Sequence, residues 1–535
     1  MGHDPKKVKP KTVLSYIEDA KNNIVSYEDY SLTYSGFFED IVNEVYELYQ
    51  KRLKEIDSVD FGDLLFYVVT ILKKDKDLLK KYQDKFKHIM VDEYQDTNKV
   101  QYDLIKLLAG EEQNLCVVGD DDQSIYKWRG ADIKNILYFQ RDFPSVKIVK
   151  LEQNYRSTAN VINAAVSVIH KNNERVEKSL WTEKGEGEKI SIYQAEDEND
   201  EALFVTDEIF DMLGEGRNMS EIAVLYRTNY QSRAIEEAML KRNIPYKLVG
   251  GFRFYDRKEV KDLVSYLRFV TNPKDYMSLL RIINTPARKM GSKSISNLAK
   301  ISKEAGATMG ELIISEYWRT HSDLSDSKVN PVVIKYLENN RSIDAFANVV
   351  ELFGSLFFAC VDLSASDSIK YIAKKIKYIE YLDDGSEAAD MKKENITELE
   401  NVASGYGEAA DSKKEFLEGV ALIENEVNKN SKQTNEQNRV TLMTLHASKG
   451  LEFPVVFMIG MEEGLLPHSR SFSEIADLEE ERRLCYVGIT RAREKLYMTF
   501  AESRMTGGDN PFGRVPSRCL GEIPQEICEY YSWNA

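Results

Sequence analysis

Hydrophobic and polar positions follow three patterns in turn along the chain. Apolar residues recur at helical spacing through residues 1–60, which predicts a helical N-terminal part. Short apolar runs then alternate with helical stretches until about residue 256, where a mainly helical pattern begins and continues to residue 427. The polar stretch 428–438 is typical of a linker, and the α/β alternation returns after it. This order predicts a helical insertion within an α/β domain.

Eight short apolar runs are predicted strands. They cover residues 88–91, 115–118, 147–151, 190–193, 222–226, 440–444, 455–459 and 496–500. Several alternate with predicted helices such as 100–108 and 201–213, which indicates a parallel sheet. The carboxyl ends of parallel strands meet at one edge, so we expect the polar residues that follow these strands to gather there.

The first predicted strand runs directly into two adjacent carboxylates, Asp92 and Glu93. At the edge of a parallel sheet one carboxylate can hold Mg²⁺ through its water shell, and the other can orient or deprotonate an attacking water. Solvated acids also follow many strands that have no such role. The stretch alone therefore leaves both interpretations open.

Composition restricts the class of protein. A length of 535 residues suggests three or four domains, and 42% hydrophobic with 30% charged residues fits a soluble, well-cored protein. No run approaches about 18 consecutive apolar residues, and no signal-peptide pattern opens the chain, so we expect no membrane contact. Five scattered cysteines favour a reducing cytoplasm over disulfides or zinc. The net charge of −16 argues against nucleic-acid binding, although a local track of Lys and Arg is sufficient for it.

A cluster after the second predicted strand carries groups suited to phosphate and to bases. Gln123 can contact a γ-phosphate or the attacking water. Tyr126, Trp128 and Arg129 combine aromatic faces, which stack on unpaired bases for about 1–3 kcal/mol each, with a cation for phosphate. This combination favours single-stranded nucleic acid. An aromatic core cluster beside a salt-bridging arginine is the alternative.

Three later segments carry similar chemistry. Tyr155 and Arg156 offer a ring for a nucleobase and a cation for a phosphate. Residues 444–453 follow a strand with small and polar residues suited to sensing a ligand across a domain cleft. Residues 482–493 are helix-like with arginines near the end, one of which can act as an arginine finger worth about 10³–10⁵ in rate. Helical arginines are more often in surface ion pairs.

Five of these segments resemble motifs II to VI of the UvrD/PcrA/Rep superfamily 1 DNA helicases, in family order and at family spacing. The segments are residues 92–96, 119–131, 153–157, 444–453 and 487–492. Each motif is short, but five in register exclude coincidence. The resemblance extends essentially from end to end and is strongest to the PcrA branch. It implies an α/β protein with two RecA-like parallel-sheet domains, the first one incomplete, and helical insertion domains.

The resemblance also implies a division of the chain into five parts. Residues 1–60 are the remainder of a first helical insertion, and residues 61–152 are the C-terminal part of the first core domain. Residues 153–256 begin the second core domain, residues 257–433 form its helical insertion, and residues 434–535 complete it.

The family's cofactors are ATP and Mg²⁺, and its motifs assign roles to single residues here. Asp92 is expected to hold Mg²⁺ with Glu93 beside it as the catalytic base, and Gln123 to couple the γ-phosphate to DNA. Tyr155 is expected to stack on adenine. The remaining expected contacts are Arg156 and Arg491, which bracket the γ-phosphate, and Glu452 with the neighbouring Gly450, which lie near the ribose.

Family members translocate 3′→5′ on one strand and unwind the duplex ahead. The implied partners are single-stranded DNA, junctions of single and double strands, and DNA repair or replication proteins. The implied location is the bacterial cytoplasm, with nucleoid association on DNA. The residues expected to line the single-strand track are Phe61, Tyr126, Trp128, Arg129, Thr444, His446 and His468.

One family element is absent. The 535 residues contain no Gly-x-x-x-x-Gly-Lys-[Ser/Thr] phosphate loop and no Gly-Lys dipeptide. In the family this loop precedes the region matched by residues 1–60, so we expect a chain that is truncated at its N-terminus and inactive alone. Three hypotheses remain: a helicase polypeptide that needs the absent segment, a degenerate module that binds single-stranded DNA or protein without ATPase activity, and a non-functional fragment with exposed sheet edges.

Overall fold

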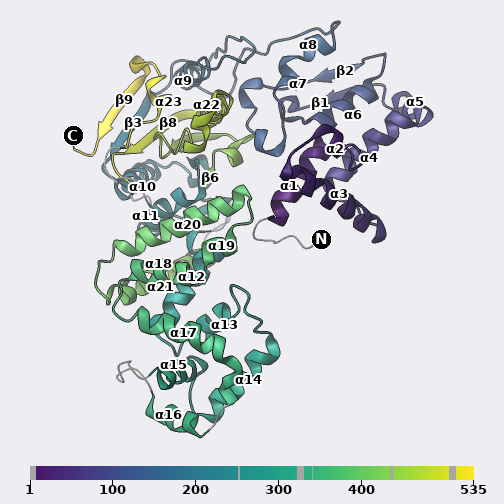
Figure 1. Cartoon of the computed structure of the whole chain (residues 1–535). Coiled ribbons are helices and arrows are strands. Elements are labelled where there is room, and N and C mark those ends of the chain that lie inside the picture. Colours follow the sequence, from purple (N-terminus) through teal and green to yellow (C-terminus); the bar gives the residue numbers. More distant parts are fainter. Residues whose placement is uncertain are drawn as a thin grey trace.

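The chain folds around two separate parallel β-sheets, one of two strands and one of seven (Figure 1). The structure is a computed structural model, and it describes residues 8–250, 253–321, 330–339, 342–433, 438–504 and 514–534. The α/β class, the parallel sheets and the many helices are as the sequence predicts.

In the described part of the chain, five α-helices precede the first sheet. They are α1 (Pro10–Asn22), α2 (Tyr30–Thr33), α3 (Phe37–Glu55), α4 (Phe61–Lys74) and α5 (Lys76–Lys85). The fully buried ammonium of Lys21 lies 2.6 Å from Asp60 Oδ2 and 2.8 Å from Asp63 Oδ1. The same two carboxylates form the capping box that starts α4. This network therefore fixes the start of α4, where Phe61 stands 90% exposed.

The smaller sheet pairs β1 (Ile89–Val91) with β2 (Leu115–Val117). The connection between them is α6 (Lys99–Ala109), and α7 (Lys134–Leu137) and α8 (Phe139–Asp142) follow β2. Tyr94, Tyr102, Phe139 and Phe143 form a small buried core with these elements. Met90 and Val118, in contrast, are 78% and 48% exposed. One face of this sheet is thus packed and the other is open.

The prediction of a strand at residues 147–151 is wrong. The structure has no regular element there, and Ile148, Val149 and Leu151 are more than half exposed. Among the described residues no strand pairs with this segment. An apolar run becomes a strand only if a neighbouring strand satisfies its backbone N–H and C=O groups.

The larger sheet has the strand order β5-β6-β4-β7-β8-β3-β9, and all its pairs are parallel. Its strands are β3 (Ile190–Ala195), β4 (Ile222–Tyr226), β5 (Tyr246–Val249), β6 (Val440–Thr444), β7 (Phe453–Met458), β8 (Ala492–Ala501) and β9 (Cys528–Ser532). The predicted strands of this region are all present, whereas β5 and β9 were not predicted. Both are edge strands with polar residues, and such strands lack the apolar run of a central strand.

Helices cover both faces of the larger sheet, as buried parallel strands require. One core contains residues of α9 (Ala159–Ile169), α22 (Ile475–Ile489) and α23 (Arg518–Gly521). The other core contains residues of α10 (Glu198–Gly214) and α11 (Ser232–Lys241). The carboxyl ends of the strands remain free to carry the polar loops.

Helices α12 to α21 form a separate helical region between β5 and β6, below the larger sheet in Figure 1. They are α12 (Lys258–Thr271), α13 (Tyr276–Ile282), α14 (Ser292–Glu304), α15 (Met309–Thr320), α16 (Pro331–Glu338), α17 (Ala347–Ala359), α18 (Ala365–Lys375), α19 (Tyr378–Leu382), α20 (Glu387–Ser404) and α21 (Ser412–Gln433). They share one hydrophobic core. The predicted linker starts within α21, and residues 434–437 lie outside the described residues.

No single described helix is long and apolar enough to cross a membrane. One bent pair, α16 with the stretch from Ile343 to Ala359, meets the length and composition criteria together.

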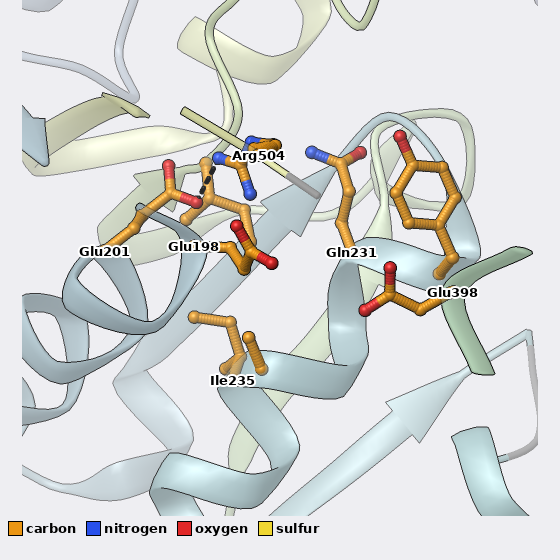
Figure 2. A pocket seen from close by; sticks show the side chains of 9 residues that line it. Glu198, Glu201, Gln231, Ile235, Glu398 and Arg504 are labelled. Atoms are coloured by element: carbon orange, nitrogen blue, oxygen red, sulfur yellow. Dashed lines mark hydrogen bonds and ion pairs between the residues drawn. The ribbon is translucent and has the colours of Figure 1, made fainter. Parts of the chain in front are cut away.

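A buried ion cluster joins α10 to the strands β7 and β8. The Arg504 guanidinium contacts Glu201 (Figure 2). It also lies 2.8 Å from Glu462 Oε1. Glu201 also accepts hydrogen bonds from Thr499 Oγ1 at 2.6 Å and from the backbone N–H of Gly460 at 2.9 Å. All three charged side chains are at most 6% exposed. The loop after β7 is therefore held by charge as well as by apolar packing.

We expect Arg504→Met to destabilise the fold by about 3–5 kcal/mol, because it leaves two buried carboxylates without their cation. Urea unfolding at neutral pH measures this loss. The matched control is Arg141→Met, which removes an arginine whose side chain is 71% exposed, and it should change the free energy of unfolding by less than about 0.5 kcal/mol. Equal effects of the two variants would contradict the prediction.

Candidate nucleotide and DNA site

Two exposed carboxylates stand at the carboxyl end of β1. The backbone leaves the strand through a hydrogen bond from Tyr94 N–H to Val118 O at 3.0 Å, and Val118 N–H returns one to Val91 O at 2.8 Å. Asp92 and Glu93 lie in the tight turn that this pairing creates. Glu93 has the left-handed conformation, with φ 51° and ψ 40°, which is uncommon for a residue other than glycine. The turn directs both acids to solvent at the sheet edge.

Gln95 joins the loop after β1 to the loop after β2. Its side-chain Nε2 donates to Glu93 Oε2 at 2.6 Å, and its Oε1 accepts from Asp120 N–H at 3.1 Å. A side chain at Gly119 would place its Cβ 2.5 Å from Gln95 Oε1, so the close approach requires glycine. In the second loop Gln123 Nε2 donates to Asp120 Oδ2 at 2.8 Å. The two loops thus form one hydrogen-bonded unit.

Lys449, from the loop after β6, reaches this unit from the larger sheet. Its Nζ lies 2.5 Å from Asp96 Oδ2 and 3.4 Å from Glu93 Oε2, and it donates to Gln123 O at 2.8 Å. The same ammonium lies 5.2 Å from the ring centroid of Tyr126. Burial raises the pKa of Asp96, and the nearby ammonium opposes that rise. One lysine therefore contacts the loops after both strands of the smaller sheet.

The opposite wall of the site carries arginines and an acid. Arg156 Nε donates to Glu452 Oε2 at 2.5 Å, and Arg156 Nη1 donates to Thr490 O at 3.4 Å. The hydrogen bond from Arg156 lowers the pKa of Glu452. Arg493 lies 3.9 Å from Glu452 as well. Beside them Tyr155 is 76% exposed, so its ring is free to take a flat partner.

Arg491 lies behind this wall and is almost fully buried. Its guanidinium donates to Val487 O at 2.9 Å and to Leu451 O at 3.0 Å. Burial, followed by the repulsion from Arg156, lowers the pKa of Arg491 to about 10. Gly450, at φ 82°, precedes Leu451 in the turn that presents this carbonyl. Arg156 and Arg491 are thus close enough for their charges to repel each other, although Glu452 also lies nearby.

Aromatic and basic groups gather beside the second loop. The rings of Tyr126 and Trp128 meet edge to face with centroids 6.3 Å apart, and the Arg129 guanidinium lies 4.4 Å from the Trp128 centroid. Trp128 is 53% exposed, so this cluster is not an interior packing cluster. Tyr126 Oη donates to His446 O at 3.3 Å. Phe61 stands apart on α4, and among the described residues its ring makes no aromatic contact with the cluster.

Three further residues predicted for the track lie on the larger sheet. Thr444 Oγ1 accepts from Ala447 N–H at 3.3 Å, and this contact shapes the loop that carries His446. Burial, followed by the charge of Arg227, lowers the pKa of His446 to about 4. His468 lies 3.8 Å from Glu394 of α20 and therefore faces the helical region.

The acidic triplet Asp120, Asp121 and Asp122 brings three carboxylates within 4.8 Å, the spacing of a metal site. Lys178 pairs with all three, and Arg175 lies 2.7 Å from Asp122 Oδ2. These cations neutralise the cluster. The paired cluster joins the smaller sheet to the segment after α9. Little negative charge is left on it to bind a further cation.

The donor set fits a magnesium ion and a terminal phosphate. Asp92 is exposed with one oxygen used by a backbone N–H, so its other oxygen is available to a metal-bound water. Arg491 carries a lowered pKa beside Arg156, and Arg493 Nε is buried without a hydrogen-bond partner among the described residues. An anion between these arginines would relieve both conditions. A phosphate loop, which would cradle the other phosphates, is absent from the sequence.

Comparison with known proteins identifies the family. Residues 1–144 match the UvrD/REP helicase N-terminal domain, and residues 149–503 match the UvrD-like helicase C-terminal domain. The chain belongs to the UvrD-like helicase family. It is 42% identical to the ATP-dependent DNA helicase PcrA of Bacillus subtilis over 536 residues, which are 98% of this chain and 70% of that protein. The PcrA proteins of Staphylococcus epidermidis and Staphylococcus aureus are each 41% identical, over 99% of this chain and 70% of their own length.

Two residues of this candidate site were not predicted from the sequence. Gln95 lies inside the first motif but was given no role, and Lys449 lies inside the motif that contains His446. Both act through contacts with residues of other loops. The sequence shows an amide beside the paired acids and a lysine among small residues. It does not show which residues of other loops they contact.

We expect the burial of neutral His446 to lower the free energy of unfolding as the solution becomes acidic. The native state keeps this histidine neutral down to about pH 4, whereas the unfolded chain protonates it near pH 6.5. Unfolding is therefore favoured as the pH falls from 6.5 to 4, by about 1–3 kcal/mol in total. Urea unfolding at pH 7 and pH 4.5 should show that His446→Gln loses less stability in acid than the unsubstituted protein. The control is His170→Gln, at an exposed histidine, and an equal effect there would contradict the assignment.

Proposed function

We propose that this chain provides the core of an ATP-dependent 3′→5′ DNA helicase that moves along one strand and unwinds the duplex ahead. The observation that carries the proposal is the junction at Lys449. This lysine links Glu93, the carbonyl of Gln123 and the ring of Tyr126. Groups suited to hydrolysis and groups suited to a DNA base thus share one contact network.

The proposed nucleotide site lies between the edges of the two sheets. Mg²⁺, when bound, would supply charge neutralisation at the phosphates, and Asp92 would hold it. Glu93, oriented by Gln95, would accept the proton of the attacking water. Arg156 and Arg491 would face the terminal phosphate from the other wall. Tyr155 would stack on the base, with Glu452 and Gly450 near the ribose.

The proposed strand track uses exposed rings and nearby cations. Trp128 and Tyr126 would stack on bases, and Arg129 would contact phosphate. Phe61 would extend the track at the start of α4, and His446 would contribute a neutral ring. Thr444 and His468 would line the larger-sheet side, where His468 must first leave Glu394.

The wider assignment follows the same chemistry. Single-stranded DNA and junctions with duplex are the proposed substrates, and repair or replication proteins are the proposed partners. A bacterial cytoplasmic location, with nucleoid association when DNA is bound, agrees with this role. A module that binds DNA or protein without turnover is the competing proposal, because the 535 residues lack a phosphate loop.

We expect residues 1–535 alone to show no DNA-stimulated ATP hydrolysis, because no backbone cradle for the β- and γ-phosphates is encoded. Phosphate release with and without single-stranded DNA measures this, and the binding of that DNA by the same preparation shows that the protein is folded. The matched control is Glu93→Gln. Turnover that is lost in Glu93→Gln would contradict the expectation and require a second phosphate site.

We expect Trp128→Ala to weaken the binding of single-stranded DNA by about 1–3 kcal/mol, the value of one stacked base. Fluorescence anisotropy with a labelled oligonucleotide measures the change. Trp533→Ala is the matched control, since Trp533 is 41% exposed near the C-terminus and lies on no proposed track. Unchanged affinity in a protein that binds DNA would show that Trp128 does not stack on a base.

A further inference from the structure

The segment from residue 73 to residue 87 is strongly basic in an acidic protein. It contains seven lysines and three aspartates, whereas the whole chain has a net charge of −16. All seven lysines are exposed. A short basic run is often only a solvated face of a helix. The contacts around this segment indicate whether it is a binding surface instead.

Most of this segment forms α5, a helix that has no buried residue. Two polar contacts hold it in place. Asp75 caps its start by accepting from Leu78 N–H at 2.8 Å, and Gln83 Nε2 donates to Leu107 O of α6 at 2.8 Å. With the helix held in this way, its lysines point outward. Figure 1 shows α5 at the outer end of the smaller-sheet region, on the side away from the larger sheet.

The aspartates of the segment are largely used within it. Asp75 serves as the helix cap, and Asp84 pairs with Lys80 and Lys87 at 3.3 and 3.1 Å. Lys73 pairs with Asp103 of α6 at 2.6 Å. Of the seven lysines of this described segment, only Lys73, Lys80 and Lys87 make ion pairs. The other four are Lys74, Lys76, Lys81 and Lys85. The segment therefore presents a surplus of positive charge.

An exposed aromatic pair lies beside these lysines. The rings of Tyr82 and Phe86 stack with centroids 6.0 Å apart and planes 15° apart, and Phe86 is 42% exposed. Lys85 Nζ lies 5.4 Å from the Phe86 centroid. Ammonium groups next to an accessible ring are the combination that binds unpaired bases and their phosphates.

We propose that this surface, the four unpaired lysines with Phe86, is a second contact for single-stranded DNA outside the strand track. The inference rests on the proposed function, because the same DNA strand would continue from the track onto this surface. Helix α4 connects the two places: Phe61 stands at its first residue, and α5 starts just beyond its last. A strand that leaves the track beside Phe61 would follow α4 to the lysines of α5.

The test compares two oligothymidylates, one of about 8 nucleotides, which fills the track alone, and one of about 30 nucleotides, which reaches further. The variant replaces Lys74, Lys76, Lys81 and Lys85 with Gln. We expect it to bind the short oligonucleotide like the unsubstituted protein and the long one at least tenfold more weakly at low salt. The slope of log affinity against log salt for the long oligonucleotide should fall by about 2–3, since each lost phosphate contact accounts for about 0.7.

The matched control removes four exposed lysines from the helical region, Lys370, Lys374, Lys375 and Lys377, by the same change to Gln. It alters the net charge equally and should leave both affinities unchanged. A further variant, Phe86→Ala, should weaken the long oligonucleotide about fivefold or more without changing the salt slope. Circular dichroism melting of each variant checks that the fold is retained.

Other outcomes overturn the inference. An equal loss in the control variant would indicate a general charge effect, and a loss for the short oligonucleotide would place these lysines in the track itself. Full competition by polyglutamate would assign the surface to an acidic protein instead. If the unsubstituted protein binds neither oligonucleotide, the proposed function fails. If it binds both and the four-lysine variant matches the control, only this inference fails.

Discussion

The contact of Lys449 with the loops of the smaller sheet is the constraint on which the arrangement of the site depends. A cation from one sheet lies among acids and a carbonyl from the other, and its side chain is only 7% exposed. Removing one partner of such a pair leaves a poorly solvated charge, which is costly. Arg483 Nε adds a hydrogen bond to Ser124 O at 3.0 Å across the same junction. The two polar edges therefore face each other.

This junction also explains how binding at one place can affect another. The ammonium that contacts Glu93 lies over the Tyr126 ring, so a movement of this ring would also change the surroundings of the acid. Coupling between sites needs an element that both sites bias, and the side chain of Lys449 contacts Glu93, Asp96 and Gln123 on the loops of the smaller sheet. The acidic triplet beside it pairs with Lys178 and Arg175, and these pairs tie the second loop to the segment after α9.

Residue patterns predicted the strands of the larger sheet because each is a buried apolar run. They predicted the acids after β1 because these follow an apolar run, although β1 itself is not buried. The run at 147–151 has the same pattern but no partner strand, and pairing is a property of the fold rather than of the segment. Lys449 and Asp96 are 353 residues apart, so no local pattern relates them. The edge strands β5 and β9 were not predicted for a similar reason. They are strands because each pairs with a neighbouring strand, and their own sequences do not indicate this.

The left-handed backbone conformation of Glu93 lowers the local stability of the turn after β1. A residue with a side chain of this kind costs about 1 kcal/mol or more in that conformation, whereas glycine or asparagine adopts it readily. Glu93 therefore stands at a position that glycine or asparagine would occupy at lower cost, and the hydrogen bond from Gln95 fixes its carboxylate at the edge of the smaller sheet.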